Sequence, residues 1–186
     1  MSHVLILLLA FLPLKALADC GNLSRKLLNV TLGETSPPGD YLDNLPQGLR
    51  LSAKFGKGRN VTYSLQGQAS GLTLRPAIVY WHDERVFVVQ MVVPGTDEAD
   101  IERLLKGLLA IAGTDVDANP KLIPPGTHLR CADGLSAHIV QGVASISASQ
   151  TIPVLIVHVE HPKLHLRMQC TANPKSCEGT PRHLYE

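Results

Sequence analysis

A short window near the end of the chain, VHVEHPKLHLRMQC (Val157–Cys170), contains three histidines and one glutamate. Imidazole and carboxylate groups are common zinc ligands, and they are also common general acids and bases. Apolar and polar residues alternate on both sides of Pro162, which predicts two β-strands joined by a turn at residues 160–163. In that hairpin His158 lies opposite His165 on the polar face, while the alternate apolar residues face the core.

The predicted pair of histidines is compatible with more than one kind of chemistry. It supplies two ligands with Glu160 nearby, whereas stable zinc sites generally have three or four protein ligands. His161 and His165 have the spacing of a helical zinc motif, but Pro162 stands where that motif needs glutamate. We interpret the histidines as the solvated face of a hairpin. A partner-contact surface and a metal site of His158, His165 and Glu160 are the alternatives, and no cofactor is predicted.

The sequence lacks the signatures of several well-known catalytic sites. The segment DVDAN begins like a calcium-binding loop, but Pro120 and Gly126 occupy the positions that require glycine and glutamate. A GxSxG elbow, a Walker phosphate loop and a dinucleotide-binding glycine motif do not occur. These observations favour a protein that is not an enzyme. The alternative is an exported hydrolase, metal-assisted or not, that uses His158 and His165.

The first residues, MSHVLILLLAFLPLKALADC, have the form of a secretory signal peptide. The apolar run Val4–Leu14 is shorter than the roughly 20 residues that a membrane-spanning helix needs. Small residues at Ala16 and Ala18 predict cleavage after Ala18, so that residues 1–18 are removed; an uncleaved membrane anchor is the alternative. We therefore expect an exported protein, periplasmic if the source is bacterial and otherwise secreted.

Charge excludes some partners for the processed chain. The full chain has 17 basic and 16 acidic side chains, and removal of Lys15 with the signal leaves 16 of each. A formally neutral chain lacks the positive surface that nucleic acids or anionic membranes attract. We therefore expect neither a nucleic acid nor a membrane as partner.

Four cysteines, an even number, suit an oxidising compartment. Of the three possible pairings, we favour Cys170 with Cys177, because Asn173-Pro174 between them is a turn signal. Cys20 then pairs with Cys131 and ties the start of the processed chain to the domain. CxxC spacing is missing from the sequence, which disfavours a redox pair or a thiolate zinc site.

The pattern of apolar residues predicts a single α+β domain over residues 48–170. Residues 19–47 are rich in turn formers and are expected to be irregular. Residues 49–65 read as a hairpin with Phe55 opposite Val61 and Leu51 opposite Leu65. Two further strands flank residues 82–85.

One amphipathic helix is predicted at about residues 97–112. Apolar residues recur there at helical spacing, Asp97 can cap the start, and Gly113 can end the helix. Later strands surround a tight turn at Asp133-Gly134. The expected fold is therefore a mostly antiparallel sheet built from hairpins, with one main helix packed on one face. Residues 171–186 are expected to form a polar tail tethered by Cys177.

The missing catalytic motifs and the two expected disulfides favour a rigid exported binding protein. Its partner would be another protein, such as a secreted enzyme or toxin for which this chain is the inhibitor or immunity protein. A small-ligand carrier is a further alternative, disfavoured because the chain has only three Phe, four Tyr and one Trp to line a pocket. Binding residues tend to lie on loop tips. The candidates are Lys57, Arg59, Trp81, His82, Asp83, Glu84, Arg85, His158, His161 and His165.

Overall fold

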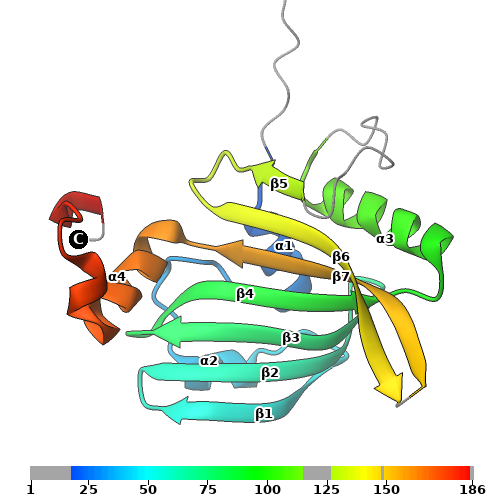
Figure 1. Ribbon diagram of the computed structural model, residues 1–186. Helices are drawn as coiled ribbons and strands as arrows, with labels where there is room; N and C mark the ends of the chain where they lie inside the picture. Colours follow the sequence, from blue (N-terminus) through cyan, green and yellow to red (C-terminus); the bar gives the residue numbers. More distant parts are fainter. Residues whose placement is uncertain (1–17, 115–126, 148, 185–186) are drawn as a thin grey trace, which may run out of the picture.

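The computed structural model describes residues 18–114, 127–147 and 149–184, and its frame is a seven-stranded antiparallel sheet (Figure 1). The strand order is β1-β2-β3-β4-β7-β6-β5, so the first four strands form a continuous meander whose last strand pairs with the last strand of the chain. This arrangement confirms the α+β class and the mostly antiparallel sheet. The strands are β1 (Leu49–Lys57), β2 (Asn60–Ala69), β3 (Leu72–His82), β4 (Arg85–Pro94), β5 (Thr127–Arg130), β6 (Ser136–Ser147) and β7 (Gln150–Glu160).

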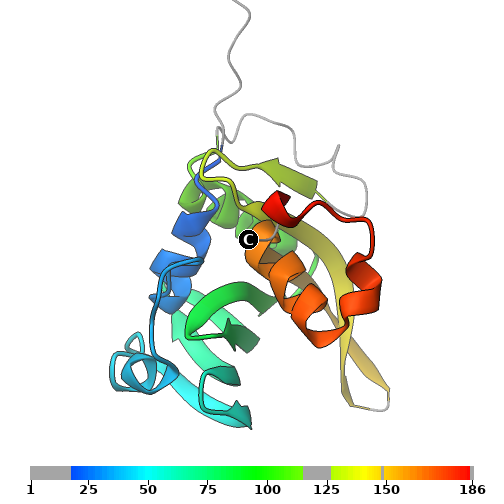
Figure 2. The same cartoon turned by 90° about the vertical axis from the view of Figure 1, so that its left-hand side faces the viewer.

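Alternate residues of each strand point to two faces of the sheet, which we call the inner and the outer face. Helices α1 (Gly21–Leu28) and α3 (Glu98–Ile111) lie together against the inner face (Figure 2). Helix α4 (Pro162–Ala172) instead packs against one end of the outer face, beside β4. Fully buried side chains on the inner face of the strands include Leu65, Val79, Val89, Met91, Val157 and Val159.

The first hairpin differs from its predicted register by one residue. Leu51 pairs with Leu65 as expected, but a β-bulge between Leu51 and Ala53 shifts the remaining pairs, so that Phe55 lies opposite Thr62. The expected pairing of Phe55 with Val61 is therefore wrong. Because a shift of one residue turns a side chain to the other face, Phe55 leaves the core side and is 61% exposed.

Residues 19–47 are not irregular as expected, because they contain two helices. The eight-residue helix α1 buries Leu23, Leu27 and Leu28 completely, and Asn29 ends it in the left-handed conformation with a φ of 55°. Helix α2 (Pro38–Asp43) follows. A helix of two turns between turn formers is too short to show a clear period in the sequence. The core therefore includes Ala18 and the segment ahead of the sheet.

Helix α3 agrees with the prediction in its position and in its capping residue. The Asp97 side chain accepts a hydrogen bond from the backbone N–H of Asp100, which satisfies one free donor of the first turn. The expectation of one main helix on one face is not confirmed, because α3 shares the inner face with α1. The buried side chains of α3 are Ile101, Leu104, Leu105, Leu108 and Leu109.

The strand expected at residues 164–170 is wrong, because this segment is helix α4. Pro162 stands in the first turn, where its missing N–H and restricted φ are compatible with a helix. His161 precedes it and caps the helix, since its Nδ1 accepts from the N–H of Leu164 at 3.4 Å. Every residue of α4 is at least partly exposed, so its apolar residues do not form a buried stripe.

The two disulfides have the favoured pairing, Cys20–Cys131 and Cys170–Cys177. The first joins the start of α1 to the end of β5 across the top of the core, and the second joins α4 to the 3-10 helix η2 (Pro174–Cys177). A last 3-10 turn, η3 (Arg182–Leu184), follows in the expected polar tail.

Two sequence predictions fall on parts of the chain that the structure does not describe. The calcium-like segment DVDAN lies outside the described residues, and so does the expected signal peptide apart from Ala18. Ala18 is buried, and its carbonyl accepts from the backbone N–H of Ala132 at 2.8 Å. Among the described helices, none has the length and apolar character needed to cross a membrane.

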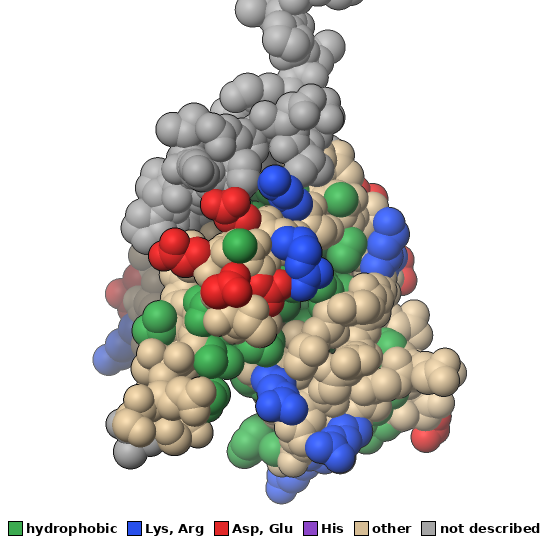
Figure 3. Space-filling view, turned by 90° about the vertical axis from the view of Figure 1, so that its right-hand side faces the viewer, with side chains coloured by type: hydrophobic (Ala, Val, Ile, Leu, Met, Phe, Trp, Pro, Cys, Tyr) green, Lys and Arg blue, Asp and Glu red, His purple; other side chains and the backbone are tan. Residues whose placement is uncertain are grey.

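The hairpin of β6 and β7 extends beyond the other strands (Figure 1). Figure 3 views the molecule from this end, where a notch separates the hairpin tip from the rest of the surface. Val143, near the tip, is 75% exposed. Acidic side chains gather above the notch.

Candidate functional site

Three histidines from adjacent strands form a row across the outer face, which we call the histidine row. The register pairs His128 of β5 with His138 of β6, and His138 with His158 of β7. The ring centroids are 3.8 Å apart in the first pair and 6.2 Å apart in the second. Side chains directly opposite on neighbouring strands are close enough to interact, so the sheet register brings these rings together.

Glu160 connects the histidine row to α4. It follows His158 by two residues and therefore lies on the same face of β7. Its Oε2 lies 2.6 Å from Nδ1 of His165 on α4 and 3.4 Å from Nε2 of His158. Burial raises the pKa of Glu160, but the hydrogen bonds with His165 and His158 outweigh this effect and hold the pKa below its ordinary value. Glu160 is therefore an ionised carboxylate between two imidazoles.

His138 is the central member of the row. Burial, followed by the neighbouring His128 and His158, lowers the pKa of His138 below its ordinary value of 6.5, with Glu160 acting in the opposite direction. Its Nε2 lies 3.4 Å from the hydroxyl oxygen of Ser136. A neutral imidazole at this position has a lone pair available for a proton or a metal ion.

The predicted opposition of His158 and His165 across a hairpin is wrong, because His165 lies on a helix. The two side chains are linked through Glu160, since both contact its carboxylate. Within the described residues, the set of three possible metal-binding groups whose ligand atoms all lie within 4.8 Å of one another is Cys20, Cys131 and Asp133. Those two sulfur atoms form a disulfide and so are not thiolate ligands.

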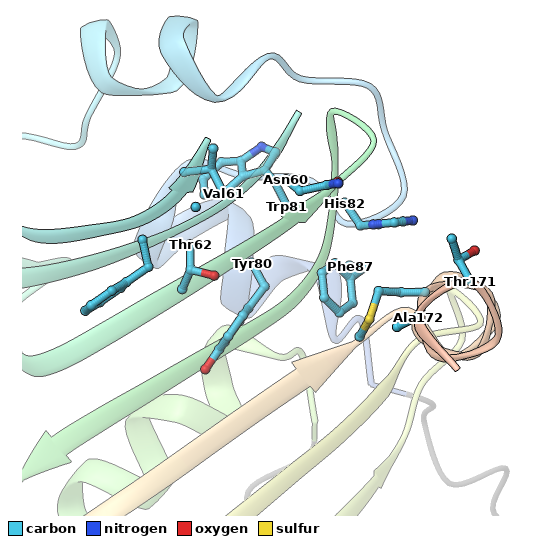
Figure 4. A pocket seen from close by; sticks show the side chains of 12 residues that line it. Asn60, Val61, Thr62, Tyr80, Trp81, His82, Phe87, Thr171 and Ala172 are labelled. Atoms are coloured by element: carbon cyan, nitrogen blue, oxygen red, sulfur yellow. The ribbon is translucent and has the colours of Figure 1, made fainter. Parts of the chain in front are cut away.

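A groove of about 470 Å³ lies between the outer face of β2–β4 and α4 (Figure 4). A smaller recess of about 220 Å³ shares Tyr80, Phe87 and Met168 with it and is also lined by His158 and His165. Together they form one largely apolar surface that ends at the imidazoles. We call the larger space the outer groove; its main lining residues are Phe55, Thr62, Tyr80, Phe87, Met168 and Thr171.

The charged candidates from two loop tips meet beside the outer groove. The Arg59 guanidinium lies 3.3 Å from the Asp83 carboxylate and 3.4 Å from that of Glu84. The backbone N–H of Asp83 donates to Oδ1 of Asn60 at 2.9 Å, which joins the two tips further. His82 lines the groove next to these charges. Five of the predicted candidates, Lys57, Arg59, Asp83, Glu84 and Arg85, therefore lie on two neighbouring tips at one end of the sheet.

Trp81 is almost completely buried, although it also forms part of the wall of the outer groove (Figure 4). Its side chain is 3% exposed, and its indole N–H donates to the backbone carbonyl of Ser36 at 2.9 Å. The ring centroids of Tyr41 and Tyr63 each lie 5.1 Å from that of Trp81. Burial of its ring and a satisfied N–H leave Trp81 little surface for a partner.

His161 lies apart from the other two histidines of its window. Its backbone N–H donates to the carbonyl of Phe87 at 2.8 Å, and its side chain caps α4. The imidazole lies against Gly33, where a Cβ atom would come within 2.7 Å of its Cδ2. His161 thus positions α4 and is not part of the histidine row.

Sequence reasoning missed His128 and His138, although the signal was present. The turn at Asp133-Gly134 was recognised, and these two histidines are five residues before and after Asp133. In an antiparallel hairpin, residues at equal distances from the turn lie opposite each other. The aromatic groove was missed for two reasons. The bulge after Leu51 turns Phe55 to the outer face, and the segment expected to be a strand at residues 164–170 is helix α4, which forms one wall of the groove.

Comparisons with family models, with curated proteins and with solved structures found no match to this chain.

Proposed function

We propose that this chain is an exported, non-enzymatic binding protein that holds a segment of a protein partner in the outer groove. The observation that carries this proposal is the apolar groove between α4 and an otherwise partly exposed sheet face, with a charged rim at one end. Exposed aromatic and methionine side chains surrounded by polar residues are typical of protein interfaces. Phe55 is such a residue, and packing of the core does not account for it.

Size and charge favour a protein segment over a small ligand. The groove and its recess are open at the surface and continue into each other through Tyr80 and Phe87. The rim carries both signs of charge, on Arg59, Asp83 and Glu84. These charges suit a partner segment in which polar residues flank an apolar side chain held in the groove. A secreted enzyme or toxin that this chain inhibits is the class of partner we favour.

The disulfides support an exported location. Both pairs of cysteines are joined, and such bonds persist mainly in oxidising compartments. The apolar N-terminal run, with its small residues before Asp19, supports a cleaved signal peptide.

The test is affinity capture from native extract with residues 19–186 and two matched variants. Phe55→Asp places a charge at the mouth of the groove, and Val143→Asp makes the same kind of change at an exposed apolar site on the distant hairpin. We expect one stoichiometric partner that the unaltered chain and Val143→Asp retain and Phe55→Asp loses. A chelator is included in parallel and should not release the partner.

Two results would contradict this proposal. A partner retained by Phe55→Asp would place the interface outside the groove. Failure to capture any protein over a range of salt concentrations would argue against a binding protein altogether.

The contact between His165 and Glu160 supports an exported hydrolase as a second candidate. A carboxylate 2.6 Å from an imidazole can orient it and increase its basicity, and the adjoining recess could admit a substrate group. Hydrolysis of an ester or glycoside panel that is lost in His165→Gln but kept in His183→Gln would support this function. Equal activity in both variants would exclude His165 as its base.

A further inference from the structure

The histidine row joins three potential ligands that no sequence spacing brings together. His128, His138 and His158 come from three different strands and occupy directly paired positions. His128 is exposed and the other two are partly exposed, and the inner core does not include them. Packing therefore does not explain why three imidazoles stand in one line.

We propose that His128, His138 and His158 form a binding site for a divalent transition-metal ion of the zinc class. Imidazole nitrogen is a preferred ligand of such ions. Zinc–nitrogen distances of about 2.0–2.1 Å require donor atoms roughly 3.3 Å apart in a tetrahedral site. The ring centroids are 3.8 and 6.2 Å apart, both wider than this donor separation, so the ligand nitrogens have to turn toward a common point between the rings.

Side-chain rotation is the movement this site requires, because the sheet register already places the three histidines at directly paired positions. The possible ligand atoms of the three histidines do not all lie within 4.8 Å of one another in the described conformation. His128 is exposed, and His138 lies between the two others. The ion then has three protein ligands and an open position for water or for another group.

Glu160 completes the site as an outer partner. It lies 3.4 Å from Nε2 of His158, which leaves Nδ1 of His158 for the ion. A carboxylate that binds the second nitrogen of a ligating histidine orients the ring and increases its basicity. This arrangement differs from the set His158, His165 and Glu160 considered from the sequence, because here Glu160 is not a ligand and His165 is not needed.

The test is titration of untagged residues 19–186, disulfides intact, with Zn²⁺ alone, followed by calorimetry and by NMR of the imidazole nitrogens. We expect saturable binding of one ion per chain and shifts of the nitrogens of His128, His138 and His158. Saturable binding should be abolished by each of the single variants His128→Gln, His138→Gln and His158→Gln. The variant Glu160→Gln should weaken binding about tenfold.

The control variants are His165→Gln and His183→Gln, which remove one imidazole each outside the proposed ligands. Both should bind Zn²⁺ as the unaltered chain does. Circular dichroism of every variant identifies any loss caused by misfolding, and the nitrogen shifts of the unaltered chain report the ligands even if a variant does not fold. The proposal is overturned if the chain shows no saturable 1:1 binding, or if binding survives His138→Gln, or if His165→Gln abolishes it.

Discussion

The inner and outer faces of the sheet are built from the same strands, yet they differ in almost every physical property. On β7, Val157 and Val159 are fully buried under α1 and α3. The residue that follows each of them, His158 and Glu160, points to the outer face and is partly exposed. The inner face is close-packed and nearly all apolar. The outer face carries imidazoles, a carboxylate and a groove with aromatic walls.

The contrast separates residues that maintain the fold from residues that remain free for another role. Inner-face side chains are determined by burial, because any polar replacement would lose its hydrogen bonds to water. Outer-face side chains contribute little to the core, so their chemistry can be used for binding. Changes on the two faces should therefore have different consequences for stability.

The largest effect is expected from the disulfide that closes the inner core. Cys20 and Cys131 are 111 residues apart, so the loop-entropy relation gives a loss of about 5 kcal/mol for Cys20→Ser/Cys131→Ser. The Cys170–Cys177 bond spans 7 residues beside the outer face, and the same relation gives about 2 kcal/mol. Guanidinium unfolding of the two double variants measures the difference. Equal losses would mean that α4 and its tail unfold together with the core.

A leucine removed from each face should also distinguish them. Leu108 on α3 is fully buried, and Leu108→Ala should lower the free energy of unfolding by about 3 kcal/mol through lost burial and a cavity. Leu166 on α4 is partly exposed, and Leu166→Ala should cost about 1 kcal/mol or less. Thermal unfolding of the pair tests this expectation, and a larger loss for Leu166→Ala would show that α4 is part of the core.

Trp81 provides a smaller effect and an optical probe of the inner face. Trp81→Phe removes the indole hydrogen bond to Ser36 and leaves that carbonyl without this partner, which should cost about 1 kcal/mol. Because Trp81 is the one tryptophan of the chain and is buried, its emission should be shifted to the blue and resist iodide quenching. Strong quenching in the folded protein would contradict its assignment to the core.

The smallest effect is expected at the exposed start of α3. The pKa of Asp100 lies below its ordinary 3.8, first because the backbone N–H of Thr96 donates to its carboxylate and then because Arg103 bonds to it. A lowered folded-state pKa stabilises the fold above the ordinary value, and this contribution is lost as the pH falls below about 3.8. Asp100→Asn should therefore flatten the acid side of the stability profile. An unchanged profile would contradict a stabilising role for the Asp100 carboxylate.

The elements that the sequence predicted correctly depend on short-range signals. Helix α3 has a period of apolar residues and a capping aspartate within one segment. The turn at Asp83-Glu84 lies between two β-branched runs, and both of its residues have positive φ angles. The disulfide pairing followed from an even count and one short loop. Each of these features can be recognised without knowing what the segment contacts.

The incorrect predictions depend on contacts between distant segments. The alternation of Leu164, Leu166 and Met168 was taken as a strand, but Pro162 and the cap from His161 start a helix there. The side of the sheet that Phe55 occupies depends on a bulge between Leu51 and Ala53, which no residue type indicates. Helix α1 is stabilised by burial of three leucines and by Cys20, and its eight residues would be marginal alone.

The sequence by itself determined most of the sheet-forming runs, helix α3 and the pairing of the cysteines, because hydrophobic period and turn chemistry act within a few residues. Only the tertiary structure decided that His128, His138 and His158 stand in one row and that α4 forms a groove with Phe55 and Tyr80. The physical reason is register: a shift of one residue between paired strands moves every side chain to the opposite face, and that register depends on bulges, turns and the packing of the whole sheet.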